Sequence, residues 1–412
     1  MTQDHGAGAP TALRRLREAN AAAVLDVVWG SAPVTGSDVM AVTGLSRATT
    51  HDVCEELIEL GWVREVENQR EHGDYRKGRP ARRYGFDGRG RVVAGVDAGE
   101  HRISATVTDL HGEVLGHEEV LASSRRATAA GRLESIATTV RAALHDAAVP
   151  EAHLLAVAVG VPAPVDAAGL TPARGNDFWA RMNPDLGGQF AAAHGWTVLV
   201  DNDANLAALA EGWRGHGRGV RSYVTLLAGE RFGAGVVEDG TLVRGARGGA
   251  GEMRFLDLVE GVGSADGIAA RARDGARRAL AGSTQPSVLR RPAAPEAEDV
   301  FAAARAGDEL ALDVLAAVGD VTARVVATLA SAFDTERVVV AGAVAASAEP
   351  VLATALQRLP RYFDPPVPQV HASELGVDVV TVGAVWRALD HVRATAVTTD
   401  LHDEPEPLAL GG

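Results

Sequence analysis

The chain has 412 residues, of which 46% are hydrophobic, and it carries a formal net charge of −14. This length and apolar content predict a folded protein of two or three domains and exclude a disordered chain. No run of 18 apolar residues occurs and the N-terminus lacks the apolar stretch of a secretory signal, so we expect a cytoplasmic protein without membrane contact. Cys54 is the only cysteine, which excludes an intrachain disulfide and a zinc site built from several cysteines.

The negative charge lies in the part of the chain after residue 91. Residues 1–91 carry 13 basic and 13 acidic residues, so the whole net charge of −14 falls on the remainder. Residues 76–91 hold seven basic residues against one acid, Asp87. Positive charge confined to one short segment is what a small DNA-contacting surface requires.

The first ninety residues carry the pattern of a winged helix-turn-helix domain, which we expect over 12–90 after a disordered stretch at 1–11. Helices are expected over 13–30, over 36–44 with Ser37 as N-cap, and from Ser46, which can cap a third helix. The runs "WVREVE" and "YRKGRPARRYGF" alternate like the two strands of a wing. A helical bundle with a solvated basic hairpin is the competing interpretation.

The third helix and the wing hold the candidate DNA contacts. The first turns of a recognition helix reach base edges in the major groove. The candidates there are Ser46, Arg47, Thr49, Thr50 and His51. The wing candidates, for phosphates or the minor groove, are Arg76, Lys77, Arg79, Arg82 and Arg83. Arg79, in a Gly-Arg-Pro segment, either enters a narrow A·T-rich minor groove or contacts only the backbone.

After residue 91 strand and helix signals alternate, which predicts an α/β architecture. The expected strands lie at 91–97, 101–110, 113–121, 153–162, 197–203, 337–343 and 377–382, with a strand–turn–strand unit over 221–243. The expected helices lie at 133–147, from Ala204, over 297–333, from about 349 and from 384.

An internal repeat predicts that this α/β region is duplicated. A shift of 130 residues aligns Ala98-Gly99-Glu100 with Ala228-Gly229-Glu230, and Asp109 with Asp239. Two related strand–turn–strand units imply two lobes with a cleft between them. That is the plan of the actin/hexokinase, or ribonuclease H-like, ATPase fold, in which each lobe offers a glycine turn to the phosphates.

Seven segments in chain order are similar to motifs of one family. They are "TGLSRATTHDVCEELIELGWV", "GRPARRYGF", "DNDANLAALAE", "RGARGGAGE", "AAARAGDELA", "RVVVAGAVAASAEPVL" and "VGAVWRAL". Over residues 12–396 the chain therefore resembles the ROK family (repressor, open reading frame, kinase). Its transcriptional regulators place a winged helix before a two-lobed sugar-kinase-like domain, which the resemblance assigns to 91–396.

The resemblance also implies an effector site. In a sugar kinase of this family a carboxylate takes the proton from the attacking hydroxyl, and the matching residue is Asp203. Asn202 and Glu252 match residues that hold sugar hydroxyls, and Asn176, near two aromatic residues, is a further candidate for lining the sugar site. The competing interpretations are a helix N-cap for Asp203 and a solvated loop acid for Glu252.

Both phosphate turns of the family are altered here. The kinases have Asp-x-Gly-Gly-Thr at the first turn, where this chain has Glu100 and His101 in place of the second Gly and the Thr. The second turn usually reads Gly-Thr-Gly-x-Gly, and here Glu230 follows Gly229. A carboxylate 4 Å from a phosphate charge costs about 4 kcal/mol at an effective dielectric near 20. Arg231 or His101 could offset part of that repulsion.

The zinc motif of the family is altered as well. Glu252 is followed by Met253, Arg254 and Phe255 instead of the usual x-Gly-His, and no cysteine occurs downstream. We therefore expect no zinc, no ATP and no other cofactor, and no enzyme activity, with Asp203 as a vestigial base position.

These observations predict a DNA-binding transcriptional regulator, and we expect a repressor. Its partners would be double-stranded operator DNA, a sugar or sugar derivative as effector, and a second copy in a homodimer or homotetramer on a palindromic site. Two alternatives stay open: an active ATP-dependent sugar kinase with an accessory DNA-binding domain, and a regulator without a ligand. Residues 397–412 are acidic and contain proline, and they predict a disordered tail.

Overall fold

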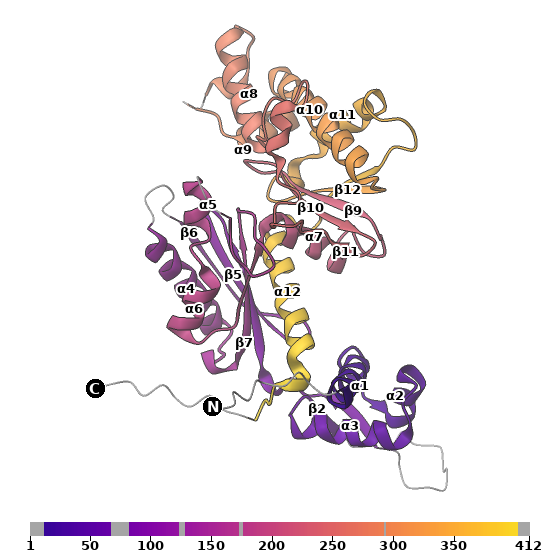
Figure 1. Ribbon diagram of the computed structural model, residues 1–412. Coiled ribbons are helices and arrows are strands. Elements are labelled where there is room, and N and C mark those ends of the chain that lie inside the picture. Colours follow the sequence, from indigo (N-terminus) through magenta and orange to yellow (C-terminus); the bar gives the residue numbers. More distant parts are fainter. Residues whose placement is uncertain (1–11, 67–81, 123–127, 173–175, 292–293, 403–412) are drawn as a thin grey trace, which may run out of the picture.

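A small helical head joins an elongated body of two lobes in the computed structural model (Figure 1). The structure describes residues 12–66, 82–122, 128–172, 176–291 and 294–402. Among these residues no helix is both long enough and apolar enough to cross a membrane.

The head is a winged helix. Its helices are α1 (Ala12–Trp29), α2 (Gly36–Thr43) and α3 (Arg47–Glu59), and its strands are β1 (Val34–Thr35), β2 (Val63–Val66) and β3 (Arg83–Phe86). The strands form an antiparallel sheet in the order β1-β3-β2. The core of the head holds Trp29 stacked on Trp62 at 5.6 Å between ring centroids, with Phe86 4.2 Å from Trp29.

Local capping explains where the two short helices of the head begin. Ser46 caps α3, as predicted, because its side chain accepts a hydrogen bond from the backbone N–H of Thr49 at 3.2 Å. The prediction that Ser37 caps α2 is wrong. The cap is Thr35, which forms a reciprocal capping box with Asp38, and such a pair satisfies two helix-end donors at once.

The two lobes repeat one sheet pattern. The first sheet has the order β6-β5-β4-β7-β8, and the second has β11-β10-β9-β12-β13. In each, three antiparallel strands continue into a parallel set. The strands are β4 (Val92–Ala98), β5 (Arg102–Asp109), β6 (Val114–Leu121), β7 (Leu154–Val161), β8 (Val198–Asn202), β9 (Tyr223–Leu227), β10 (Gly233–Glu238), β11 (Thr241–Leu242), β12 (Arg337–Ala341) and β13 (Gln369–Ala372). The repeated order confirms the predicted duplicated actin/hexokinase-like fold.

Helices cover both sheets. In the first lobe they are α4 (Ala129–Asp146), α5 (Asp177–Met182) and α6 (Leu186–His194), and in the second α8 (Ile268–Gly282), α9 (Ala297–Arg305), α10 (Glu309–Phe333) and α11 (Glu349–Arg358). The helices α7 (Asp203–Arg214) and α12 (Val379–Thr395) pack on each other, and α12 also packs on β4 and β7. Figure 1 shows α12, in yellow, running from the junction of the lobes toward the head.

One predicted strand of the body is wrong, and the helices α5, α6 and α8 were not predicted. The strand predicted over 377–382 is wrong, because this segment enters α12, and the sheet strand lies earlier at β13. Val379, Val380 and Thr381 are all buried, and a helical turn that is buried all round has the same continuous apolar run as a buried strand. The helix α8, which was not predicted, is rich in Ala and Arg.

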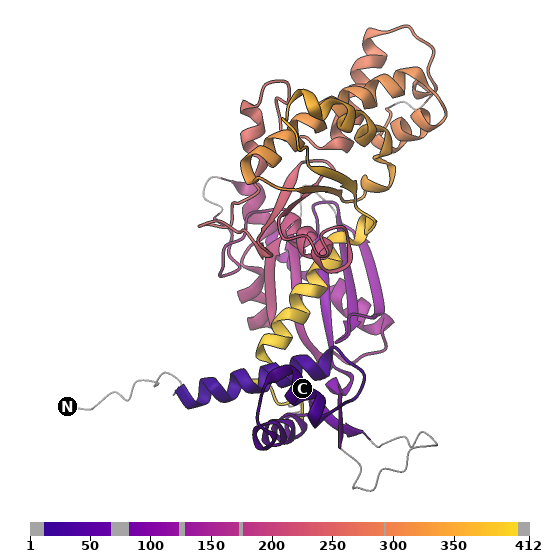
Figure 2. The same ribbon diagram turned by 90° about the vertical axis from the view of Figure 1, so that its right-hand side faces the viewer.

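The prediction of a disordered tail from residue 397 is wrong for residues 397–402. Leu401 is 3% exposed, and its backbone N–H donates to the carbonyl of Leu60 at 3.0 Å. The indole N–H of Trp62 donates to the carbonyl of Thr399 at 2.8 Å. Residues 399–401 are therefore docked on the head, and Figure 2 shows α12 ending beside it. Residues 1–11 and 403–412 lie outside the described residues.

The contact of α12 with α7 leaves no room for a side chain at Gly383. A Cβ there would lie 1.8 Å from the carbonyl oxygen of Leu206. We expect Gly383→Ala to lower the free energy of unfolding by roughly 1–3 kcal/mol, since two helix backbones must move apart. Chemical denaturation measures this. Gly282→Ala, at a position where a Cβ meets nothing within 4 Å, is the matched control, and equal losses in both variants would contradict the described packing.

Candidate ligand cleft and nucleic-acid interface

Three carboxylates come near one another at the junction of the two lobes, and we refer to this junction as the cleft. Asp97 is the last residue but one of β4. Asp203 begins α7 directly after β8, and Glu252 follows β11 in the second lobe. Burial, with the nearby charges of Asp97 and Glu252 adding to it, raises the pKa of Asp203 to about 7. The sequence reading gave Asp203 and Glu252 as site residues but missed Asp97, although the turn after it was singled out.

Burial perturbs the other two carboxylates as well. It raises the pKa of Asp97 to about 6 against the opposing attraction of Arg102, whose guanidinium lies 3.6 Å away. It also raises the pKa of Glu252, with the charge of Arg231 acting in the opposite direction. A protonated carboxyl group both donates and accepts hydrogen bonds, which suits a polyhydroxylated ligand.

The two asparagines of the predicted effector site are engaged in helix capping. Asn202 accepts from the N–H groups of Ala204 and Asn205 at 3.0 and 3.1 Å, and its amide donates to the carbonyl of Ala163 at 3.2 Å. Asn176 caps α5 by accepting from the N–H of Trp179 at 3.1 Å. The cap of α7 is thus Asn202 and not Asp203. Sugar contacts by either asparagine stay a prediction.

A buried arginine lies behind the first glycine turn. Arg132 of α4 is 5% exposed, and its guanidinium donates to the carbonyls of Ala98, Gly99 and Met182. Burial lowers its pKa to about 10, against the attraction of two nearby carboxylates. Its donors are directed at backbone carbonyls, so it holds the turn and the end of α5 together. Glu100 in this turn lies 3.7 Å from the imidazole of His101.

The second glycine turn carries a paired carboxylate. The guanidinium of Arg273, on α8, donates to both oxygens of Glu230, at 2.7 and 2.8 Å. The helix that follows the hairpin therefore supplies a counter-ion for Glu230, which the sequence analysis did not identify.

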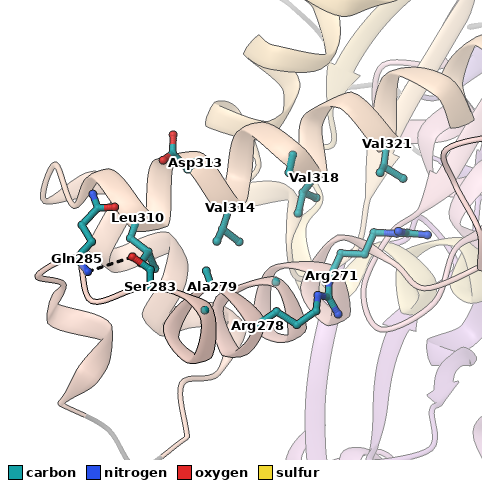
Figure 3. A pocket seen from close by; sticks show the side chains of 13 residues that line it. Arg271, Arg278, Ala279, Ser283, Gln285, Leu310, Asp313, Val314, Val318 and Val321 are labelled. Carbon is teal, nitrogen blue, oxygen red and sulfur yellow. Dashed lines mark hydrogen bonds between the residues drawn. The ribbon is translucent and has the colours of Figure 1, made fainter.

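A separate hollow of about 540 Å³ lies between α8 and α10 (Figure 3). Val314, Val318 and Val321 line it from α10, and Arg271 and Arg278 line it from α8. Arg271 is committed to the fold, since its guanidinium donates to the backbone carbonyls of Val262, Ser264 and Asp266. None of the three cleft carboxylates lines this hollow.

The structure sorts the predicted contacts on the recognition helix. Arg47 and His51 are exposed on α3, whereas Thr50 is 3% exposed and its side chain belongs to the interior of the head. Thr50 cannot reach a base edge, so that prediction is wrong. Ser46 and the half-buried Thr49 have their hydroxyls 2.9 Å apart at the helix start.

The wing candidates are described only in part. Arg82 is exposed and lies 3.6 Å from both Glu55 and Glu65. Arg83 is half-buried and donates to the carbonyl of Pro33 at 2.6 Å, which ties the strands of the head together. Arg76, Lys77 and Arg79 lie outside the described residues. Over the ranges that the structure describes, no group of three or more His, Cys, Asp or Glu side chains is placed to hold a metal ion.

Residues 93–391 match the ROK family over both lobes of the body. The chain belongs to the ROK family. Residues 19–67 match the IclR helix-turn-helix domain, and this range contains α2, α3 and the second part of α1. Together the two matches confirm a ROK protein with an N-terminal helix-turn-helix.

Relatives of the chain include both kinases and regulators. A glucokinase of Halalkalibacterium halodurans is 28% identical over 46% of this chain, and a putative xylose repressor of Caldicellulosiruptor is 24% identical over 54% of it. The matched regions span 62% of that glucokinase and 54% of that repressor.

Solved structures extend the likeness. A glucokinase from Streptomyces griseus in complex with glucose and AMPPNP is 28% identical, with a TM-score of 0.62 over 73% of this chain and 99% of its own. A ROK family transcriptional regulator, a homologue of the E. coli MLC protein, has a TM-score of 0.75 over 93% of this chain and 98% of its own, at 21% identity. The latter shares the whole arrangement of head and body, and at that identity the likeness concerns the fold.

The raised pKa of Asp203 predicts a pH-dependent stability. A carboxyl group whose pKa rises from 3.8 unfolded to about 7 folded favours the fold while it is protonated. Stability is therefore lost as the pH rises from about 4 to 7. Asp203→Asn keeps an acceptor for the N–H of Ala204 but never ionises, so it should exceed wild type by roughly 1–3 kcal/mol at pH 8 and match it near pH 4.

Denaturant unfolding at pH 4 and pH 8 checks this prediction. Asp313→Asn, which removes one exposed carboxylate of α10, controls for the loss of a charge. A gain for Asp203→Asn that is equal at the two pH values, or larger at pH 4, would show that the carboxyl group is not destabilised by burial.

Proposed function

We propose that this ROK protein is a DNA-binding transcriptional repressor whose two-lobed domain senses a sugar and no longer phosphorylates it. The observation that supports this most directly is the recognition helix. Its start is capped by Ser46, and Arg47 and His51 stand exposed beside the wing. In helix-turn-helix proteins these early positions read base edges, while basic wing residues contact phosphates.

One head offers a small footprint on DNA. A homodimer or homotetramer on a palindromic operator would multiply the contacts, with half-sites spaced by the two-fold symmetry of the protein. In this proposal the body supplies the contacts between copies, and the wing residues Arg76, Lys77, Arg79 and Arg82 supply most of the phosphate contacts.

The proposed effector is a polyol held by Asp203, Glu252, Asn176 and Asn202, with Asp97 as an addition from the structure. A regulator needs the effector to favour one arrangement of the lobes over another. The physical route to the head is α12, which packs on α7 next to the cleft and leads into the segment docked on Trp62. An effector that moves α7 would therefore bias the position of the head.

Loss of the nucleotide and zinc sites belongs to the same proposal. Glutamates occupy both glycine turns, Phe255 stands where the family motif has a histidine, and no cysteine follows Cys54. The competing function is an active sugar kinase, which the glucokinase relatives and the retained carboxylate of Asp203 favour.

Selection of bound sequences from random DNA at two salt concentrations tests the regulator function. Arg47→Ala should lose about 1–3 kcal/mol of discrimination between operator and random DNA, because a base contact is removed. Arg79→Ala should weaken binding to all sequences and flatten the salt dependence if this arginine contacts only phosphate. Arg305→Ala, on α9 in the second lobe, is the control, and unchanged binding in the first two variants would mean that another surface contacts DNA.

A coupled phosphorylation assay over a panel of sugars tests the alternative. We expect no turnover with MgATP, because the phosphate turns are occupied by carboxylates. Turnover of any common sugar above about 1 per second, in the ordinary range of enzymes, would establish the kinase function instead.

A further inference from the structure

The second glycine turn of the body is closed by its own side chain. Glu230 follows Gly229 at the tip of the β9–β10 hairpin, and Arg273 lies on the first half of α8. The two side chains form a bidentate pair with N–O distances of 2.7 and 2.8 Å. A planar guanidinium gripping two oxygens in this way is also how arginine recognises phosphate.

The N-terminus of α8 is occupied by the same turn. The N–H groups of Gly267, Ile268 and Ala269 donate to the carbonyls of Glu230, Ala228 and Gly229, at 2.8, 2.9 and 3.1 Å. Free N–H groups at a helix start attract anions, but these three have backbone partners. The guanidinium of Arg273, by contrast, is held by a movable side chain in a bidentate pair, whereas the neighbouring Arg231 has a looser side-chain partner, Asp266, at 3.7 Å.

Other ionic contacts surround the pair of Glu230 and Arg273, so the local fold does not depend on Glu230. Arg273 also lies 3.5 Å from Asp274 and 3.8 Å from Glu296, and Arg277 pairs with Glu296 at 2.7 Å. Glu230 is 53% exposed, and Arg273 is 21% exposed. A guanidinium that is largely covered, with its main partner at the surface, keeps its position when that partner is exchanged.

We propose that Arg273 is a latent binding group for phosphate oxyanions and that Glu230 is the built-in anion that occupies it. The inference rests on the proposed loss of nucleotide binding and gives it a mechanism. Because the carboxylate of Glu230 belongs to the same molecule, its effective concentration at Arg273 is high. It therefore excludes a free oxyanion from Arg273 in the wild type. The carboxylate of Glu230 therefore takes the place of a phosphate at this turn, instead of repelling phosphate as an unpaired charge.

This arrangement has a consequence for a sensor. If the two-lobed body bound nucleotide, the nucleotide would favour one arrangement of the lobes at every concentration of the effector. Because Glu230 stays paired with Arg273, the anion position in the second lobe is occupied at all nucleotide concentrations. The position of the lobes then depends on the effector alone.

Titration calorimetry of the full chain with inorganic pyrophosphate, and separately with MgATP, tests the proposal. Wild type should bind pyrophosphate weakly or not at all. Glu230→Gln removes the charge at nearly constant shape and should bind at least tenfold more tightly than wild type. Glu230→Gly, which also removes the remaining amide contact, should bind at least as well as Glu230→Gln. The double variant Glu230→Gln with Arg273→Met should return to the wild-type level.

Glu296→Gln removes a carboxylate from the same cluster without opening the pair, so it should behave as wild type and is the matched control. Tight pyrophosphate binding by wild type would overturn the proposal. So would absence of binding in both single Glu230 variants with wild-type unfolding midpoints, or retained binding in the double variant. Operator binding by the same preparations reports separately on the regulator function, which can fail while the oxyanion result stands.

Discussion

The backbone contact between α12 and its neighbours is the constraint on which the rest of the structure depends. Gly383 lies against the carbonyl of Leu206 in α7, and a Cβ at Gly95 of β4 would lie 2.5 Å from the carbonyl of Thr381. Helix and strand backbones this close leave little freedom to slide. The helix α12 starts where Arg102 donates to the carbonyl of Val377, near the cleft, and it leads into the segment docked on the head. One rigid element therefore spans the distance from the carboxylates at the lobe junction to the head.

Patterns that depend on neighbours in the chain were readable from the sequence, and contacts between distant residues were not. The alternating strands of the first lobe, the glycine hairpin of the second and the Ser46 cap follow from local spacing and were predicted. The strand predicted at 377–382 failed because the first turn of α12 is buried on every side, so that no helical period marks it. The order of the motifs located Asp203 and Glu252, but no local signal told that Asp97 would come to lie near them, since that depends on how β4 and α7 meet.

The arginines that lie beside the turns of Glu100 and Glu230 could not be predicted from the sequence. Each turn is followed by a helix that supplies an arginine, Arg132 for the first and Arg273 for the second. The partner of Glu230 lies 43 residues further along the chain, so its pairing could not be read from the turn itself. The two arginines also differ in kind. Arg132 is buried on backbone carbonyls that cannot leave, whereas Arg273 holds a side chain that can, and only the second arrangement leaves an exchangeable anion position.

Retention of Asp203 is compatible with loss of phosphoryl transfer, because the same properties serve binding. A carboxyl group with a pKa near 7 is partly protonated at neutral pH and can donate as well as accept a hydrogen bond. As a general base it would need a phosphoryl group held in line with the sugar, and here the turn that would hold that group is closed by Glu230 and Arg273. In the proposed function, proton acceptance by Asp203 therefore leads to no transfer. The cleft of the proposed sensor is then left with the recognition of hydroxyl groups, and α7, which begins at Asp203 and packs on α12, would carry that recognition to α12.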